Sequence, residues 1–296
     1  MGKVDLHFHT INSDGAFTTA AILKMCEEND LKIISITDHD SMQSYFDIKN
    51  QNLDFNGKII AGVELSFKKE GRLFDVLGYG VDVEYINSWI KERYKKEALI
   101  KNQESILEEM KKLYTKLGIK FDTNLKVAIG KKSEAYNLIK NSALQYEENR
   151  AVAPELFGDM FYKKYHTNSQ SKYFVDETKM LPSLTECLKV IHDAGGISSL
   201  AHSGAYGFTK EEMRKFIEYA INCGVKGLEL KYNCHTEDDE RLIKTLAERS
   251  NLYLTGGSDF HGGKVKPNVK IGKIYNQKNI YENDMSKFLN VIKYFK

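Results

Sequence analysis

The chain has 296 residues and a mass of 33.9 kDa, enough for one large core or two smaller ones. Its 43 Lys and Arg residues nearly balance 41 Asp and Glu residues, so electrostatics give no reason to expect a nucleic-acid backbone or a membrane as the main partner. The sequence has no secretory signal pattern, no long apolar window and no Cys-x-x-Cys pair among its four cysteines. We therefore expect a cytoplasmic protein with buried thiols and no membrane span.

Seven apolar, β-branched runs bounded by Gly or polar residues are typical of strands. They are residues 4–9, 33–37, 59–65, 73–79, 196–201, 225–232 and 252–255. The first run alternates apolar and polar side chains, which points His7 and His9 to the same face. That geometry suits metal binding, but it equally suits two solvated histidines on an edge strand.

Helical patterns separate many of these runs. Ser183 and Glu186 form the capping box of one predicted helix, and Thr209 and Glu212 form that of the next. A third helix is predicted over 236–250. The alternation of strands and helices predicts a mainly parallel α/β sheet.

Residues 86–181 interrupt this alternation. The stretch from Trp89 to Gly118 has the period of one long amphipathic helix, and the residues after it are polar, Tyr-rich and mostly helical in pattern. We therefore expect a mainly helical insertion subdomain at 86–181. It would divide a catalytic α/β domain made of residues 1–85 and 182–296.

Histidines and carboxylates cluster near the ends of the predicted strands. They are His7, His9, Asp38, His39, Asp40, Glu64, Asp75, His202, Glu229, Asp259 and His261. In a barrel of parallel strands, such ends converge on one mouth. Each residue alone could cap a helix or form a hydrogen bond in the core. Burying so many unpaired groups would cost roughly 1 to 3 kcal/mol apiece, a cost that bound cations remove.

The types of these side chains indicate which metals they would bind. Imidazoles mixed with carboxylates, without thiolates, favour Zn, Mn or Fe over Ca or an iron–sulfur cluster. About ten candidate ligands are too many for one ion, whereas two or three ions sharing a bridging carboxylate would use them. Metal clusters of this kind are suited to phosphoryl chemistry.

Four motifs resemble, in order, those of the polymerase and histidinol phosphatase (PHP) superfamily: DLHFHTINSDG, ITDHDS, LAHSG and GGSDFHG. The resemblance covers roughly residues 1–85 and 182–275. AGVELSF, LTGGSDFHG and HDAGGISSLAHSG are similar to the branch that includes nucleoside-monophosphate phosphatases and 5′-to-3′ exoribonucleases acting on short RNA. The resemblance implies a distorted (β/α)7 TIM-like barrel that uses two or three divalent ions, Mn, Zn or Fe.

The resemblance also implies a ligand set at a trinuclear site, with metal-bound hydroxide attacking phosphorus. His7, His9, Glu64 and Asp259 would bind the first ion; Glu64, His202 and Asp75 the second; and Asp14, His39 and His261 the third. Asp75 stands where many relatives carry a histidine, and carboxylate still coordinates. Asp259 and His202 are counted among the catalytic residues.

Substrate contacts are implied at three further positions. His235, in YNCHTEDD, matches a histidine near the substrate in relatives, and it would protonate the leaving oxygen or contact phosphate. A plain helix-start histidine is the equal alternative. Arg150 and Lys231 are weaker phosphate-binding candidates, because 43 basic residues make chance placement easy. In the insert, RAVAPE retains only the first arginine of the Arg-x-His-x-x-Arg pattern of nucleotide-phosphatase relatives, which argues against 5′-AMP or short RNA as substrate. His192 is interpreted as structural, and His166 receives no role.

These features predict a metal-dependent hydrolase of phosphoric esters, a phosphatase or phosphodiesterase acting on a small phosphomonoester or nucleotide. One alternative is a 5′-to-3′ exonuclease on short single-stranded RNA or DNA. In that function, insert aromatics would stack bases: Tyr136, Tyr146, Phe161 and Tyr162. Another alternative is a non-catalytic, metal-stabilised binding module. The sequence indicates no oligomeric state.

Overall fold

The structure is a computed structural model that describes residues 2–128, 133–158, 161–166, 168–263, 266, 268–274 and 277–296, with positions 163 and 164 described by their backbone only. The chain forms two compact units. Unit 1 comprises Met1–Phe67, Phe74–Ile90 and Pro182–Lys296, and unit 2 comprises Lys68–Leu73 and Lys91–Leu181. Within the described ranges, no helix is long and apolar enough to cross a membrane.

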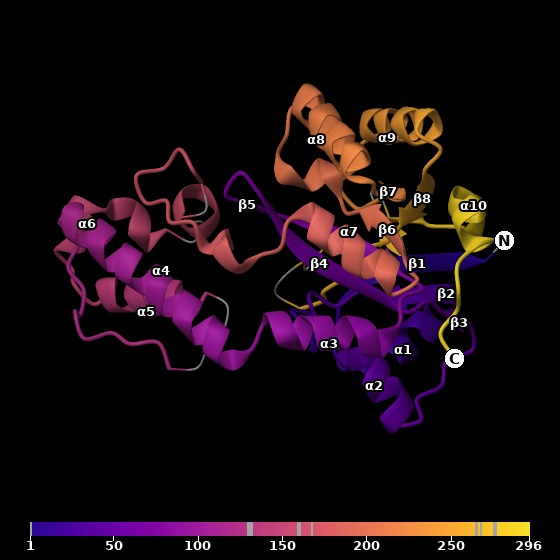
Figure 1. Cartoon of the computed structure of the whole chain (residues 1–296), viewed down its shortest axis with the longest axis horizontal. Coiled ribbons are helices and arrows are strands. Elements are labelled where there is room, and N and C mark those ends of the chain that lie inside the picture. The colour runs from indigo at the N-terminus through magenta and orange to yellow at the C-terminus, as the bar shows by residue number, and fades with distance from the viewer. Residues whose placement is uncertain are drawn as a thin grey trace. The chain divides into compact units, whose positions relative to one another are not determined.

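Unit 1 contains the strands that carry most of the predicted ligands (Figure 1). β1 (Lys3–Phe8), β2 (Leu31–Ile36) and β3 (Lys58–Ile59) form a parallel sheet in that order. A second sheet has the order β4-β5-β6-β7-β8, with bounds Gly62–Lys69, Arg72–Tyr79, Ile197–Leu200, Gly227–Lys231 and Tyr253–Gly256. β5 and β6 are antiparallel, whereas β6, β7 and β8 are parallel.

The predicted mixed α/β class is confirmed, and single β-bridges link the two sheets. One joins Phe8 to Phe260, and the other joins His39 to Glu64. The strands of the described residues form no closed sheet, so a closed (β/α)7 barrel stays a prediction. A small antiparallel pair, β9 (Lys273–Ile274) and β10 (Lys278–Asn279), follows β8.

The predicted strand 59–65 is in fact two strands, β3 and β4. The chain passes so close to β2 at Gly62 that a Cβ there would lie 2.1 Å from Ser35 Oγ. The Gly62 N–H also donates to Tyr45 Oη at 2.6 Å, while the hydroxyl donates to the Ile36 carbonyl at 2.7 Å. This tertiary approach ends the pairing with β2, and β4 then turns into β5 through Glu70 and Gly71, both at positive φ.

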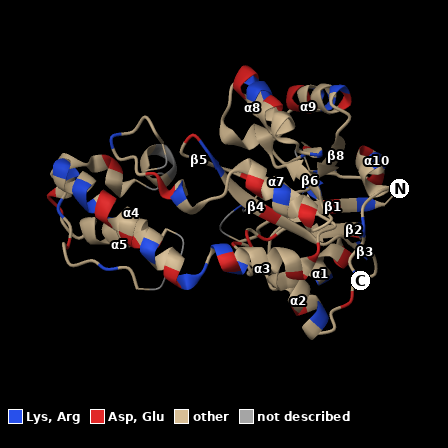
Figure 2. Cartoon of the chain, viewed as in Figure 1, with Lys and Arg blue, Asp and Glu red and all other residues tan. Residues whose placement is uncertain are grey.

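Helices accompany the strands of unit 1. They are α1 (Thr19–Glu28), α2 (Gln43–Asn50), α3 (Val83–Arg93), α7 (Leu184–Asp193), α8 (Lys210–Cys223), α9 (Glu237–Arg249) and α10 (Ser286–Leu289), with 3-10 turns at Ser203–Tyr206 and Glu282–Met285. The two predicted capping residues, Ser183 and Thr209, each accept a hydrogen bond from the third residue of the helix, and Thr236 caps α9 in the same way. Acidic residues fill the first turn of α9 and Arg249 lies in its last turn (Figure 2), which complements the helix dipole.

Unit 2 is built on α4 (Lys96–Lys116) and α5 (Glu134–Ala143). Shorter elements follow: α6 (Asn149–Val152), 3-10 turns at Pro154–Phe157 and Glu177–Met180, and a π-helix at Tyr162–His166. The prediction of one helix from Trp89 to Gly118 is wrong, because extended backbone at Lys95 separates α3 from α4. No Pro or Gly lies at this break, and the spacing of the apolar residues continues through it, so the sequence did not indicate it. Gly118 does end α4, at φ +70°.

The capping box of α7 offers a test of local helix stability. Ser183→Ala removes the hydroxyl that accepts from the Glu186 N–H, so we expect the free energy of unfolding to fall by about 0.5 to 2 kcal/mol. Urea denaturation would measure this change. Ser105→Ala, on the exposed face of α4, is the matched control and should change stability by less than about 0.5 kcal/mol. Equal effects of the two substitutions would contradict the capping role.

Candidate metal centre

The Glu64 carboxylate on β4 is the centre around which four imidazoles gather. Its Oε2 lies 3.2 Å from His7 Nε2 and 3.2 Å from His9 Nε2. The same oxygen lies 3.4 Å from His39 Nδ1, and Oε1 lies 2.9 Å from His202 Nε2. Glu64 is fully buried, so these imidazoles take the place of water around its charge.

His7 and His9 lie at the end of β1 and are both fully buried. This excludes the alternative of two solvated histidines on an edge strand. Asp259, from the segment after β8, closes the group on the opposite side, with Oδ1 3.2 Å from His9 Nε2 and 3.6 Å from His7 Nε2. The three side chains form one of the groups that could hold a metal ion.

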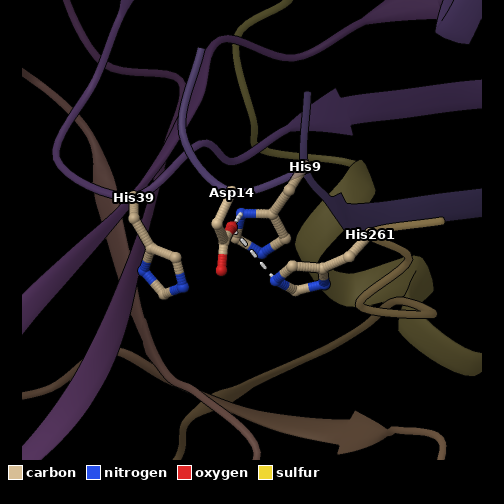
Figure 3. A group of neighbouring side chains, drawn as sticks. All are labelled: His9, Asp14, His39 and His261. Atoms are coloured by element: carbon tan, nitrogen blue, oxygen red, sulfur yellow. Dashed lines mark ion pairs between the residues drawn. The ribbon is translucent and has the colours of Figure 1, made fainter. Parts of the chain in front are cut away.

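A second group lies beside the first and includes the most exposed candidate ligand (Figure 3). Asp14 Oδ1 lies 3.1 Å from His261 Nε2 and 3.6 Å from His9 Nδ1. His39 completes the group. The Asp14 side chain is 47% exposed, whereas that of His261 is 3% exposed, so this side of the centre is open to solvent.

Asp75 on β5 and His202 after β6 lie on the other side of Glu64. Asp75 Oδ1 accepts from Ser66 Oγ at 2.8 Å and lies 3.9 Å from His39 Nδ1, while its Oδ2 lies 4.0 Å from His202 Nε2. His7, Glu64 and His202 form one possible metal group, and His39, Glu64 and Asp75 form another. All nine predicted metal ligands therefore belong to four overlapping groups.

Charges in the centre shift the pKa values of its members. Burial alone would lower the pKa of His7, but the carboxylates of Glu229, Glu64 and Asp259 raise it well above its usual range. Burial would raise the pKa of Glu64, but the surrounding imidazoles hold it well below its usual range. For Asp75, burial and the nearby Glu64 carboxylate both raise the pKa.

Several buried nitrogens have no hydrogen-bond partner among the described residues. Three of them lie in the centre, His9 Nε2, His39 Nδ1 and His202 Nδ1, and the fourth is His166 Nδ1 in unit 2. The first two face carboxylate oxygens at 3.2 to 3.4 Å without hydrogen-bond geometry. Unpaired imidazole nitrogens and shared carboxylates fit divalent transition metals, which bind both kinds of ligand.

Glu229 on β7 orients two of these histidines, although the sequence indicated only that it lies near a strand end. Its Oε1 lies 2.9 Å from His7 Nδ1, and its Oε2 accepts from the His202 backbone N–H at 2.8 Å. A proton on His7 Nδ1 therefore faces Glu229, and Nε2 faces the centre. Carboxylates of this kind fix the tautomer and direction of metal-binding histidines.

Asp38 holds the loop after β1, a role that the sequence did not indicate. Its Oδ1 accepts from the Thr10 N–H and from Ser13 Oγ, both at 2.7 Å. Its Oδ2 accepts from Thr10 Oγ1 at 2.8 Å and from Ser44 Oγ at 2.5 Å. The three bonds from Thr10 and Ser13 fix the backbone before Asp14, and the bond from Ser44 ties Asp38 to α2. The hydroxyl-rich composition of the loop was the available signal.

A phenol and an ammonium group contact Asp259 in addition to the histidines. Tyr232 Oη donates to Asp259 Oδ2 at 2.8 Å, and Lys266 Nζ pairs with the same oxygen. Burial would raise the pKa of Asp259, but His7, His9 and Lys266 hold it well below its usual range. Neither Tyr232 nor Lys266 was singled out from the sequence.

The predicted substrate contacts lie outside the four groups. His235 is buried, with Nδ1 2.9 Å from the Leu230 carbonyl and Nε2 accepting from the Gly204 N–H at 3.2 Å. Lys231 on β7 pairs with Glu240 at 2.8 Å. Arg150, in unit 2, pairs with Glu147 and lies over the Phe157 ring.

The remaining histidines have local partners. His192 lies 3.0 Å from Ser198 Oγ, and burial lowers its pKa, in keeping with the structural role predicted for it. His166 in unit 2 lies 2.9 Å from Glu177 Oε1. Neither belongs to the metal groups.

A family model for the PHP domain matches residues 5–202, from within β1 to His202. The chain belongs to the PHP domain family. The predicted superfamily is therefore confirmed, and the metal centre lies in the part of the chain that the family shares, completed by Asp259 and His261 beyond it.

Curated relatives of this PHP-family chain have different named activities. A 5′-3′ exoribonuclease of Haemophilus influenzae is 26% identical over 265 residues, covering 88% of this chain and 90% of that one. A 3′,5′-nucleoside bisphosphate phosphatase of Chromobacterium violaceum is 25% identical and covers 88% of both chains. A solved structure from Bifidobacterium adolescentis, provisionally described as a metal-dependent phosphoesterase, has a TM-score of 0.61 at 22% identity, covers 97% of this chain and 94% of that one, and shares the fold.

The contacts of Glu229 predict an effect on metal affinity. Glu229→Gln removes the charge beside His7 Nδ1, so we expect Mn²⁺ to bind about 10 to 100 times more weakly in a calorimetric titration. Glu240→Gln, which alters only the pair with Lys231, is the matched control and should leave the affinity unchanged. Unchanged Mn²⁺ binding by the Glu229 variant would contradict its orienting role.

The centre also predicts how the stability of the metal-free protein depends on pH. Burial would lower the pKa of His9, but Asp259 and Glu64 raise it from 6.5 to about 9. Because the pKa is raised on folding, the charged imidazole stabilises the fold fully at a pH below about 6.5. This stabilisation is lost as the pH rises through about 9. We expect the Tm in EDTA to fall across this window, and to fall less with Mn²⁺, which replaces the proton.

Thermal unfolding at several pH values, with EDTA or Mn²⁺, would measure this dependence. His9→Gln should flatten the EDTA profile, because it removes the titrating imidazole. Parallel profiles with and without Mn²⁺ would show that the ion does not bind at these histidines.

Proposed function

We propose that this chain, a metal-dependent phosphoesterase of the PHP family, hydrolyses a small phosphorylated metabolite, either a phosphomonoester or a nucleotide. The observation that carries the proposal is the set of nine histidines and carboxylates in four overlapping groups around Glu64. So many convergent ligands in one buried place favour several ions acting on one phosphate.

We assign the ligands to three ions. His7, His9, Glu64 and Asp259 would hold one; Glu64, Asp75 and His202 a second; and Asp14, His39 and His261 a third. Divalent ions bound there supply an activated water and neutralise charge on the phosphoryl oxygens. Mn, Zn and Fe suit this donor set.

The chain's own residues prepare the centre for such ions. Glu229 keeps a proton on His7 Nδ1 and leaves Nε2 facing Glu64 and Asp259. Asp38 fixes the loop that carries Asp14, the ligand at the solvent-exposed side, where a phosphate would enter. Pre-organised ligands of this kind reduce the reorganisation that catalysis would otherwise require.

His235 is the residue predicted to protonate the leaving oxygen. Both ring nitrogens of His235 face backbone groups, so proton transfer from this residue would require one of those bonds to open. Burial also lowers the pKa of His235, which favours the neutral ring. A phosphate contact from Lys231 would similarly require it to leave Glu240.

A 5′-to-3′ exonuclease is the second candidate, favoured by the name of the relative from Haemophilus influenzae. The base-stacking role predicted for Tyr136 and Phe161 is wrong, because only 6% and 1% of these residues are exposed. Tyr162 and Tyr146 retain partial exposure. An exonuclease would therefore have to bind bases through surfaces other than the Tyr136 and Phe161 rings.

A substrate panel tests the proposal. We expect the Mn-reconstituted protein to hydrolyse one class among sugar phosphates, nucleotides, cyclic phosphates, histidinol phosphate and short oligonucleotides. The readout is phosphate release for the monoesters and chromatography of the products for the diesters. Asp259→Asn should lower the rate by at least about 100-fold, because it removes a charged ligand of the centre. Gel analysis of labelled oligonucleotides separates the candidates, since a monoesterase removes terminal phosphate without shortening the chain.

The control for the panel is Asp193→Asn, an exposed ion-pair partner of Lys189 on α7 that should keep full activity. Equal turnover by the Asp259 variant and the unchanged protein would place the hydrolysis elsewhere. A folded, metal-loaded protein that cleaves no ester in the panel would instead favour the non-catalytic module.

A further inference from the structure

Unit 2 contains a cavity of its own, of about 340 Å³. Every residue that lines it belongs to unit 2, from the β4–β5 turn, α4, the start of α5 and the segment before Pro182. A cavity of this volume is in the range of small-molecule binding sites in proteins. It contains none of the nine metal-ligand candidates.

Flat apolar surfaces make up much of the lining. Tyr94, Tyr162 and Phe174 contribute aromatic rings, and Leu73 and Leu99 contribute aliphatic side chains. Leu73 is 49% exposed, so part of its side chain is available to a ligand. These walls favour a flat, apolar-faced ligand.

A buried amide supplies a hydrogen-bond donor without a partner. Gln103 is 4% exposed, and its Oε1 accepts from the Ala135 N–H at 2.9 Å, which fixes the amide orientation. Among the residues that the structure describes, nothing accepts from its Nε2. Nε2 is not one of the fully buried unpaired atoms, so it is accessible from the cavity that Gln103 lines, and a ligand acceptor can take the place of water there.

The other polar residues of the lining define the ligand further. Asn102 lies beside Gln103 on α4 and can both donate and accept. Glu177 presents a carboxylate that Tyr162 and His166 hold at 3.1 and 2.9 Å. The lining contains a cation, Arg72, as well as the Glu177 carboxylate, so its charge does not select an anion. An acyl chain would leave both amides unpaired. The cavity therefore suits a flat ring that carries acceptors and donors on one edge.

We propose that this cavity binds a nucleobase, carried by a nucleoside or nucleotide. The ring would lie against the aromatic walls, with an acceptor facing Gln103 Nε2 and a donor facing Asn102 or Glu177. The proposal does not depend on the phosphoesterase function, because a nucleoside carries no phosphate and the cavity holds none of the metal ligands.

Calorimetric titration of the full-length, EDTA-treated protein with adenosine, guanosine, cytidine and uridine tests the proposal. We expect saturable binding of at least one nucleoside. Gln103→Glu keeps the acceptor for the Ala135 N–H and replaces the donor with a carboxylate oxygen, so it should weaken that binding at least tenfold. Gln145→Glu makes the same change at an exposed position outside the cavity and should leave binding unchanged.

Asn102→Leu provides a second variant at the same wall, should the Gln103 variant lose its cooperative thermal transition. It removes the amide oxygen that would accept from the ligand's donor, so it should also weaken binding. If either lining variant bound a nucleoside as tightly as the unchanged protein, the placement of the base edge against Gln103 and Asn102 would be overturned. No heat of binding with any nucleoside at 10 mM would overturn the proposal. Binding of the apolar probe 1-anilinonaphthalene-8-sulfonate, but of no nucleoside, would overturn it in favour of a purely apolar site.

Discussion

The candidate centre depends on the buried Glu64 carboxylate and the four imidazoles around it. A carboxylate without solvent is unfavourable unless positive charge surrounds it, and here protons on histidines or metal ions must supply that charge. The same requirement brings together segments that are far apart in the sequence, from His7 to His202. Protonation, metal binding and local fold stability are therefore linked through one side chain.

A surrounding layer of carboxylates directs this charge. Glu229 joins the ends of two strands by holding His7 through its ring and His202 through its backbone. Asp38 holds the loop before Asp14 through three hydrogen bonds from Thr10 and Ser13. Most of the acidic residues of the centre are therefore either candidate metal ligands or hydrogen-bond partners of candidate ligands and their loops.

Local patterns in the sequence predicted the strands, the caps and the residue types of the centre. The capping box at Ser183 needs only four neighbouring residues, and strand ends converge in any parallel sheet. The split at Gly62 was not predictable, because it depends on contact with Ser35 on another strand. The contacts of Glu229 with His7 and His202 were not predictable for the same reason, because they join different strands. The break at Lys95 has no Pro or Gly to mark it.

The division of the chain at the β4–β5 hairpin affects how this protein can be rearranged. The strands that carry Glu64 and Asp75 continue into Lys68–Leu73, which belongs to unit 2 although it lies far in sequence from the rest of that unit. Unit 2 is therefore not a single cassette. A chimera with a relative would have to exchange the hairpin tip together with Lys91–Leu181, because either piece alone would leave part of unit 2 behind.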